Sequence, residues 1–571
     1  MEKLNEQQQE ILSVLLDGIF AVHENSADIK QNGRSVSKKE RSKADYELLA
    51  AMKKYDKLLR QTFPEFPNIV FQRGRFAYSL FSAVSKEGLK ETQKYLLAMD
   101  NLDICAPYIN GQANALHWAI AKGSLLCAWN IFDSEKFQNL EVDRKRRFLI
   151  NKDDCGFTLV QEAVAGGNEA ILTRAMDEAK AALGDKNPEF KALFTDKTDA
   201  FFTLMQHAAA SENEVIFTRI MDEAKAALGE NSPEFKALFT DKTDALFTLA
   251  QQAATNGHEA IFTRVMDEAK AALGENSPEF KALFTDKTDA LFTLAQDAVT
   301  GGNEAIFTRV MDEAKAALGE NSPEFKALFT DKTDALFTLV QQAAINGHEA
   351  IFTRVMDEAK MVLGEKSLEF KALFTDKTNT LSMLAQHAAT SGNEIIFTRV
   401  MDEAKAAFGE KSPEFKTMFT DKTDALFTLV QHAAIGGNEA VFTRATSEAK
   451  AVMIEHAERA AIYSDTDAQL FHILHSLAKW APNNIIHNVL CDAHEELGDG
   501  FLVWVNAENS FGFTPLDTAL IKNKDPDAAE TIRSFGGQTN KYDPNKYIYT
   551  NDDTQAVAMT FRSRAPLGLV A

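Results

Sequence analysis

The chain has 571 residues, 45% hydrophobic and 25% charged, which is ordinary for a folded protein but longer than one compact domain. Its formal net charge of −22 argues against a nucleic-acid partner, because binding to a phosphate backbone needs a positive surface. The sequence contains no uninterrupted apolar stretch of about 18 residues, so no membrane span is expected.

The N-terminal segment, residues 1–70, is predicted to be a helical cap. It opens with MEKLNEQQQEILSVLLDGIFAVH, in which acidic residues precede an apolar run that Asp17 interrupts. This pattern is typical of an amphipathic helix and not of a cleaved secretory leader. A charged stretch, SKKERSKADYELLAAMKKYDKLLRQ, follows. The exposed end of a stacked array needs a polar cover of this kind.

The central region repeats itself every 45 residues. A Thr-Arg pair marks each of seven copies, at Arg174, Arg219, Arg264, Arg309, Arg354, Arg399 and Arg444. A fixed period of this length predicts a stacked array in which each unit contacts only its neighbours. Residues 246–290, one period, hold seven acidic and four basic residues, so the repeats supply most of the negative charge.

One copy predicts three helices. A short helix over residues 248–254 ends at Asn256-Gly257, because glycine accepts the left-handed conformation of a helix end. A longer helix over residues 258–273 carries apolar residues at helical spacing and ends at Gly274. A third helix over residues 279–285 follows Ser277-Pro278, a capping residue and a first-turn proline. No alternating strand pattern is present, so an all-α solenoid with three helices per central repeat is expected.

The copies resemble ankyrin repeats. Residues 248–258, TLAQQAATNGH, lie over the ankyrin pattern T-P-L-H-x-A-A-x-x-G-H. The outer units are closer still, with NALHWA at 114–119, DDCGFT at 153–158 and FGFTPLDTAL at 511–520, and weaker units surround Leu80 and Leu477. The resemblance implies an ankyrin-like solenoid with divergent repeats over 71–151, extended repeats over 152–456 and degenerate and C-terminal repeats over 457–537. A tail occupies 538–571 and is expected to be flexible.

The resemblance has clear departures. Ankyrin repeats have about 33 residues, whereas these have 45. The extra PEFKALFTDK helix falls where ankyrins carry a β-hairpin finger, so the fingers are expected to be altered or lost in the central units. Glutamine stands at the ankyrin histidine position, where it is expected to hydrogen-bond backbone in the adjoining loop. These glutamines are Gln161, Gln206, Gln251, Gln296, Gln341, Gln386 and Gln431.

Extended, near-identical units are also similar to those of ankyrin effectors that intracellular bacteria export by type IV secretion. The tail ends in TFRSRAPLGLVA, with Leu569 third from the end, which is compatible with a C-terminal export signal. This resemblance implies a protein located in the bacterial cytoplasm before export and in the host cytoplasm afterwards. Its partner would be a host protein, and a basic surface is expected because acidic surface speeds encounter with positive charge.

Variation between copies concentrates at the residue after the repeated glutamine and at the following turn. In ankyrin stacks the first helices line the concave, ligand-facing side, and a varied row on a uniform scaffold is what a recognition surface needs. The predicted partner-binding row is Glu162, His207, Gln252, Asp297, Gln342, His387 and His432. Neutral drift at a solvated position is the alternative.

Other charged and reactive residues are interpreted as structural. Each repeated arginine lies three residues before an aspartate in most copies, as in Arg264 and Asp267, which predicts an ion pair on one helix surface. Cys491 and His494 share a helix face but lack an aimed base with an orienting third group. His472, His475 and His487 are explained by a varied helix surface, and the four cysteines by reduced core thiols.

No catalytic residue, metal site or cofactor is therefore expected, and the chain is predicted to be a non-enzymatic protein-binding scaffold. Two alternatives stay open. One is an enzyme whose site lies in the first 70 residues or in residues 457–499. The other is a structural or regulatory protein inside the bacterium.

Overall fold

The computed structural model describes residues 38–542, apart from gaps at 63–65, 69, 74–75, 106–112, 154–155, 199–201, 244–246, 289–291, 335, 379–382, 424–426 and 467–471. The amphipathic helix expected at the N-terminus, most of the 538–571 tail and Cys155 lie outside these residues. The chain divides into two compact units, residues 1–319 and 320–571. Both are helical solenoids, so the expected all-α class with three helices per central repeat is confirmed.

The described part of the first unit begins with a long helix and a hairpin, followed by short helices. The elements are α2 (Lys38–Thr62), β1 (Val70–Arg73), β2 (Phe76–Ser79), α3 (Leu80–Lys86), α4 (Lys90–Leu97), α5 (Ala115–Ala121), α6 (Leu125–Phe132), α7 (Glu135–Gln138) and α8 (Val142–Ile150). β1 and β2 pair antiparallel, Val70 opposite Ser79, and form the only sheet among the described residues. Buried Asp45 of α2 accepts the backbone N–H groups of Glu91 and Thr92, both at 2.9 Å, and so caps α4.

Each central repeat contributes a first, a second and a third helix. The first helices are α9 (Leu159–Ala165), α12 (Leu204–Ala210), α15 (Leu249–Thr255), α18 (Leu294–Gly301), α21 (Leu339–Asn346), α24 (Leu384–Ser391) and α27 (Leu429–Gly436). The second helices are α10 (Glu169–Leu183), α13 (Glu214–Leu228), α16 (Glu259–Leu273), α19 (Glu304–Leu318), α22 (Glu349–Leu363), α25 (Glu394–Phe408) and α28 (Glu439–Val452). The third helices are α11 (Pro188–Thr195), α14 (Pro233–Thr240), α17 (Pro278–Thr285), α20 (Pro323–Thr330), α23 (Leu368–Thr375), α26 (Pro413–Thr420) and α29 (His456–Ser464).

Local chemistry sets these bounds, as the sequence predicts. Thr248 caps α15, where its Oγ1 accepts the Gln251 N–H at 3.3 Å while Gln251 Oε1 accepts the Thr248 N–H at 3.0 Å. Gly257 follows in the left-handed region with φ +72°, and Gly274 ends α16 with φ +88°. Ser277 Oγ accepts the Phe280 N–H at 3.0 Å at the start of α17. The predicted and observed bounds of all three helices agree within one residue.

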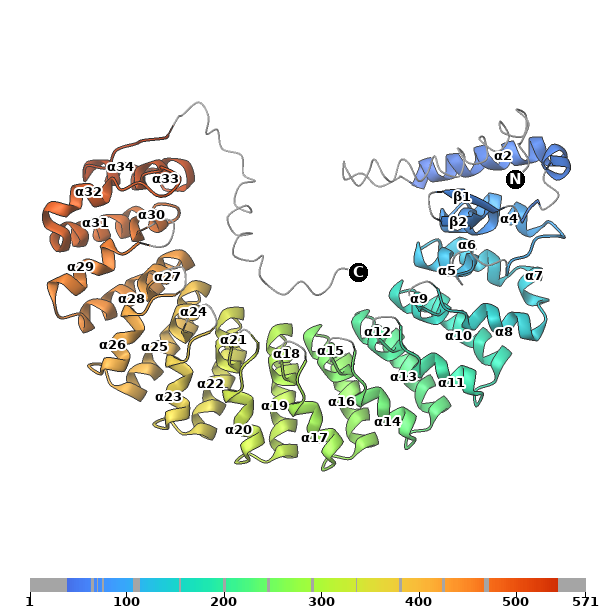
Figure 1. The fold of residues 1–571 in the computed structure, drawn as a ribbon, viewed down its shortest axis with the longest axis horizontal. Helices are drawn as coiled ribbons and strands as arrows, with labels where there is room; N and C mark the ends of the chain where they lie inside the picture. The colour runs from blue at the N-terminus through green and yellow to red at the C-terminus, as the bar shows by residue number, and fades with distance from the viewer. Residues whose placement is uncertain are drawn as a thin grey trace. The chain divides into compact units, whose positions relative to one another are not determined.

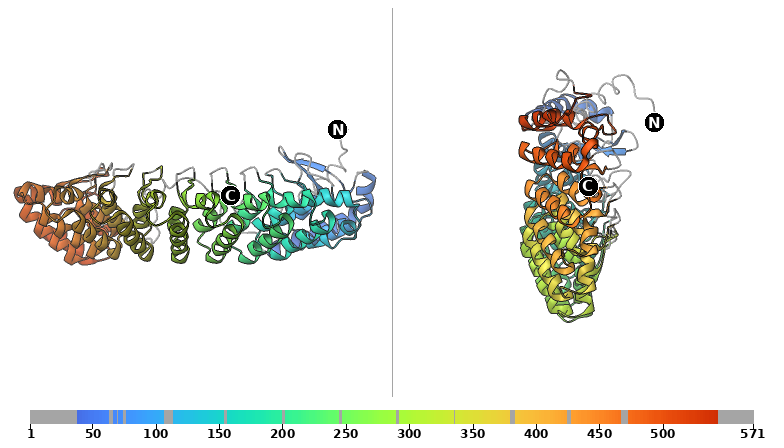
Figure 2. Two further views of the ribbon diagram at one scale, coloured as in Figure 1. Left: turned by 90° about the horizontal axis from the view of Figure 1, so that it is seen from below. Right: turned by 90° about the vertical axis from the view of Figure 1, so that its left-hand side faces the viewer.

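Within each unit the helices form three layers, with the second helices between the first and the third (Figure 1). Successive repeats stand side by side (Figure 2, left). Within a unit, third helices pack against the second helix of their own repeat and that of the next, as α14 does with α13 and α16. Its two phenylalanines are fully buried; the rings of Phe235 and Phe239 lie 5.4 Å apart and nearly perpendicular. The extra residues of the 45-residue period thus add a third layer whose apolar face is buried. Burying one such phenylalanine side chain stabilises the fold by about 1.5–3 kcal/mol.

The described part of the second unit ends in elements outside the regular three-helix repeats. They are α30 (Ile473–Leu477), α31 (Asn483–Leu497), the 3-10 turn η1 (Gly498–Gly500), α32 (Phe501–Val505), α33 (Pro515–Lys522) and α34 (Pro526–Ser534). Trp504 is buried, donates its indole N–H to the Tyr463 carbonyl at 2.9 Å and stacks on His472. These contacts join the degenerate repeats to α29.

The repeated arginines connect successive repeats. Arg264 binds Asp222 of the preceding repeat at 2.7 Å and Glu268 of its own helix at 2.9 Å. The sequence-based pairing of Arg264 with Asp267 is wrong, because Asp267 binds Arg309 of the next repeat at 2.5 Å. Stacking places residues about one period apart beside each other, and this proximity outweighs spacing along one helix. The same arginine contact to the preceding repeat occurs at Arg219, Arg399 and Arg444.

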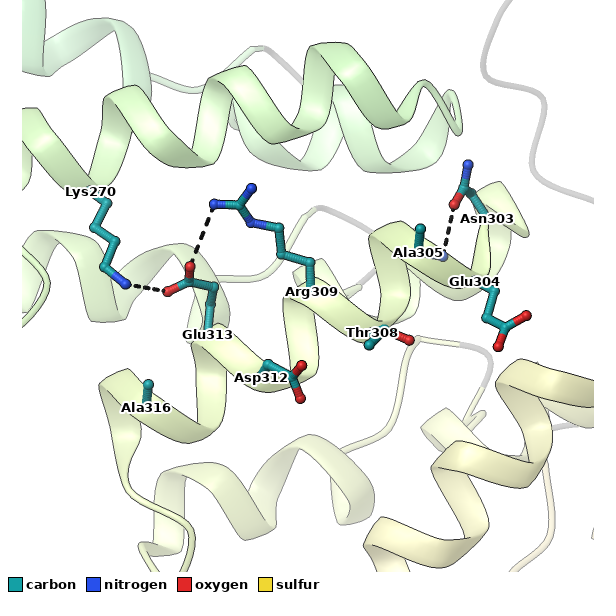
Figure 3. A pocket seen from close by; sticks show the side chains of 9 residues that line it. All are labelled: Lys270, Asn303, Glu304, Ala305, Thr308, Arg309, Asp312, Glu313 and Ala316. Carbon is teal, nitrogen blue, oxygen red and sulfur yellow. Dashed lines mark hydrogen bonds and ion pairs between the residues drawn. The ribbon is translucent and has the colours of Figure 1, made fainter.

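Lysines make two further rows of contacts between repeats. Lys270 binds Glu313 of the next repeat at 2.9 Å, and Arg309 approaches the same carboxylate to 3.6 Å (Figure 3). Lys242 binds Asp286 at 2.7 Å on the segment that follows the third helix. These three rows of inter-repeat ion pairs, here called the ladders, are partly exposed, so each pair contributes about 0–1 kcal/mol.

Candidate functional site

Repeated glutamines tie first helices to the loop of the next repeat in five copies, those of Gln206, Gln251, Gln341, Gln386 and Gln431. The Nε2 group of Gln251 donates to the Phe292 carbonyl at 3.3 Å, that of Gln341 to Asp376 at 3.0 Å and that of Gln386 to Asp421 at 3.1 Å. In the outer repeats the ring nitrogens of His117 and His475 contact the Asn151 and Phe513 carbonyls at 3.0 and 3.3 Å. The structural role predicted for the glutamines is therefore confirmed in these five copies.

The predicted partner-binding row lies one residue further along each first helix. All seven residues occupy the fourth position of their helices, in α9, α12, α15, α18, α21, α24 and α27. None is fully exposed: Asp297 is 3% exposed, Gln252 is 8% exposed, and the other five are half-buried. The row therefore lies below the outermost surface of the first-helix layer, and its role in binding stays a prediction.

Phenylalanine rings cover several row residues. The ring of His207 lies 4.8 Å from Phe157 and 5.2 Å from Phe202, which belong to successive repeats. Phe337 and Phe427 make similar contacts with His387 and His432, at 5.3 and 5.5 Å. The phenylalanine recurs immediately before the capping threonine in most copies, and sequence analysis missed it although its 45-residue period was a readable signal.

Several polar atoms of the row are buried without a hydrogen-bond partner. They are Nε2 of His207, His387 and His432 and Oδ2 of Asp297. Thr390 donates its hydroxyl to the Gln386 carbonyl at 2.9 Å, so its 2.8 Å contact with His432 is best made by a proton on Nδ1 of the histidine. That assignment leaves His432 Nε2 as an acceptor.

Burial removes charge from the row at neutral pH. It lowers the pKa of His207 and of His387 to about 4, and burial followed by repulsion from His387 lowers the pKa of His432 to about 3. Burial, with a smaller contribution from the Asp153 carboxyl, raises the pKa of Glu162 to about 8. Burial raises the pKa of Asp297 well above its usual range, against hydrogen bonds from Gln251 and Thr255. At pH 7 these residues are therefore mainly neutral.

The turn before the first helix keeps one geometry in the central copies whose turn residues the structure describes, and also before α33. The Thr243 N–H donates to the Phe247 carbonyl at 3.0 Å, as the Asp153 N–H does to Phe157 at 2.8 Å and the Asn509 N–H to Phe513 at 3.0 Å. The sequence predicts that the fingers are altered or lost in the central units. The base of the turn is kept there, with threonine in place of Asp153 or Asn509. The tips, such as residues 244–246, lie outside the described residues.

Exposed glutamates form two rows that take no part in the ladders. One row lies at the first position of the second helices: Glu169, Glu214, Glu259 and Glu304 in the first unit, and Glu349, Glu394 and Glu439 in the second. The other lies in the first turn of third helices: Glu234, Glu279, Glu324, Glu369 and Glu414. Carboxylates favour helix N-termini through the helix dipole, but they also leave much of the net negative charge at these two surfaces.

An open hollow of about 960 Å³ lies along α19 beside Lys270. Figure 3 shows Arg309 and Glu313 on the side of α19 toward Lys270, and Glu304, Thr308 and Asp312 on another side of the same helix. Arg309 and Glu313 are already engaged in the ladders, so the hollow itself does not indicate a ligand.

The residues considered for other chemistry are dispersed or buried. His472 and His475 are buried with their rings 4.2 Å apart, so the expected varied helix surface is wrong for this pair. Cys491 is exposed, not a core thiol, and its sulfur lies 3.7 Å from His487 Nδ1. Among the described residues no three or more His, Cys, Asp or Glu side chains are placed to hold a metal ion.

Comparison with known proteins identifies no family. No protein-family model matches the chain, and no curated protein matches it significantly. In the described part of the chain, every helix is too short or too polar to cross a membrane.

Proposed function

We propose that this chain is a non-enzymatic scaffold that binds a protein with a basic surface. The observation that carries the proposal is the division of charge within each repeat. Arginine, lysine, aspartate and some glutamate side chains pair between repeats, as in the contacts of Arg264 with Asp222 and Lys270 with Glu313. The glutamates at the starts of second and third helices stay exposed outside these pairs.

This division favours a basic partner for an electrostatic reason. Exposed carboxylates repeated along a stack create a negative potential that speeds encounter with positive surfaces. The row from Glu162 to His432 is mainly neutral at pH 7, so within the proposal it adds shape and hydrogen bonding to this attraction. The turn geometry shared with the ankyrin-like outer units supports the use of the first-helix layer as the docking face.

The proposal extends to a role as an exported effector that docks a host factor. This part rests on the similarity of the near-identical extended units to ankyrin effectors of intracellular bacteria. It would locate the chain in the bacterial cytoplasm before export and in the host cytoplasm afterwards. A secretion assay that compares the full chain with a chain ending at residue 537 tests it, and equal export of both would refute a C-terminal signal.

Affinity capture from host-cell lysate tests the binding function. We expect capture of basic proteins by the full chain, with loss after Glu349→Gln, Glu394→Gln and Glu439→Gln together. A second variant carries alanine at Glu162, His207, Gln252 and Asp297. If that variant, with wild-type circular dichroism, captures the same partners, the predicted row is wrong; if the full chain captures nothing above a bead control, the scaffold proposal fails.

A further inference from the structure

The second unit carries exposed isoleucines where most other repeats have alanine or threonine. Ile345, near the end of α21, is 37% exposed; Ile435, at the same place in α27, is 40% exposed; and Ile395, second residue of α25, is 55% exposed. The positions equivalent to Ile345 and Ile435 hold Ala165, Ala210, Thr255, Thr300 and Thr390 in the other copies. The positions equivalent to Ile395 hold Ala170, Val215, Ala260, Ala305, Ala350 and Ala440.

These isoleucines lie on one continuous edge, formed by the turns between first and second helices. Asn393 donates its side-chain N–H to Glu349 Oε1 at 3.1 Å and to the Gly347 carbonyl at 3.4 Å, which joins the turns after α21 and α24. The turns after α24 and α27 are closer still: a Cβ on Gly392 would lie 2.5 Å from the Gly436 carbonyl oxygen. The backbone N–H of Ile395 donates to Asn393 Oδ1 at 3.0 Å, which fixes Ile395 beside the same turn.

Folding gives no reason for isoleucine here. An exposed side chain gains little from burial, and repeats with threonine or alanine at the same positions make the same backbone contacts and ladders. Isolated surface hydrophobic residues are normal, but apolar residues gathered on one edge and surrounded by polar ones mark interaction sites. The isoleucines are therefore better explained by contact with a partner than by stability.

The edge is also acidic. Glu349, Glu394 and Glu439 begin α22, α25 and α28 beside the same turns, and all three are exposed. Adjacent packed helices are about 8–10 Å apart, so the two repeats from Ile345 to Ile435 span about 16–20 Å. A helix rises 1.5 Å per residue, so one of about 11–13 residues covers this length. A complementary helix would have an apolar stripe for the isoleucines and lysine or arginine beside it for the glutamates.

We propose that the turn edge of the second unit, defined by Ile345, Ile395, Ile435, Glu349, Glu394 and Glu439, is a docking surface for a basic amphipathic helix of a partner protein. The inference rests on the proposed binding function and narrows it to a surface and a partner chemistry. Apolar contact supplies affinity, and the glutamates select the basic helix over an acidic one.

Three fluorescein-labelled 14-residue helical peptides test the docking surface by fluorescence anisotropy. They share one leucine stripe and differ only in a flanking face of lysine, glutamine or glutamate. We expect the lysine peptide to bind the full chain at least 10-fold more tightly than the glutamine peptide, and the difference to shrink as salt is raised. The glutamate peptide should bind weakest.

Substitutions taken from the other repeats keep the fold intact. The triple variant Ile345→Thr, Ile395→Ala and Ile435→Thr should weaken the lysine peptide at least 10-fold, while Val215→Ala in the first unit should change nothing. Unchanged binding by the triple variant, or equal binding of the three peptides, overturns the proposed surface. In the lysate capture, a triple variant that retains all partners would reject this surface alone, whereas a full chain that captures none would reject the binding function itself.

Discussion

Replacing Glu162 by glutamine is expected to stabilise the folded chain at neutral pH. The unfolded chain ionises Glu162 near its ordinary pKa of 4.5, whereas burial and the neighbouring Asp153 raise its pKa in the folded chain to about 8. Between these values the unfolded state binds fewer protons, so the free energy of unfolding falls as pH rises. Each pH unit above the unfolded pKa costs the folded chain about 1.4 kcal/mol. The stabilisation by Glu162→Gln at pH 7 therefore has an upper limit of about 3.4 kcal/mol. Because Glu162 is half-buried and water screens part of the cost, we expect about 1–3 kcal/mol.

Urea unfolding of both chains from pH 4 to 9, followed by circular dichroism, measures this difference. The two chains should be equally stable below pH 4.5 and diverge up to about pH 8. A repeat array need not unfold in one step, so amide hydrogen exchange in α9 provides a local measurement. Gln252→Glu is the reciprocal control and should lose stability over a similar pH range. Parallel pH profiles for Glu162→Gln and the wild type would refute the reasoning.

Three further predictions use the repeats as internal templates. Leu368→Pro should raise the free energy of unfolding by about 0.4–1 kcal/mol, because Ser367 already has the extended backbone that Ser322 has before Pro323 in the neighbouring copy. The reverse change, Pro323→Leu, should lower it. Urea unfolding midpoints measure both changes, and no gain from Leu368→Pro would contradict the template argument. Glu212→Gly should stabilise by about 0.5–1 kcal/mol, because Glu212 has φ +62° where the other copies have glycine; a fall in thermal midpoint would contradict this. Deleting residues 230–274 joins Gly229 to an identical ENSPEF segment and should leave a cooperatively folding helical chain, whereas a molten circular dichroism spectrum would show that the copies are not interchangeable.

Local chemistry made the helices of each repeat predictable. Capping by Thr248, the glycine ends at Gly257 and Gly274 and the Ser277-Pro278 start depend only on nearby residues, and the structure places helix ends there. The role of Gln251 was also predictable, because a buried amide needs a partner and the next loop is the nearest. The hairpin of β1 and β2 was not predicted, since four-residue strands leave little periodic signal.

Relations between repeats were harder to predict. Arg264 was assigned to Asp267 because spacing on one helix is visible in sequence, whereas its contact with Asp222 depends on how two repeats stack. The depth of the row also depends on stacking: variation at His207 resembles that of a solvated position until Phe157 of the preceding repeat covers it. Sequence analysis did not single out Ile345 and Ile435, because helical periodicity alone does not show whether an apolar residue near a helix end is buried or exposed.

The ladders have a consequence for how such a chain can change over generations. Within each row the described central rungs join the same residue types, so a recombination between two near-identical gene segments that adds or removes a whole period again brings arginine to aspartate, lysine to glutamate and lysine to aspartate. The length of the array can then change by whole repeats while the ion pairs between repeats are preserved. The few positions at which the copies differ can vary without disturbing these pairs.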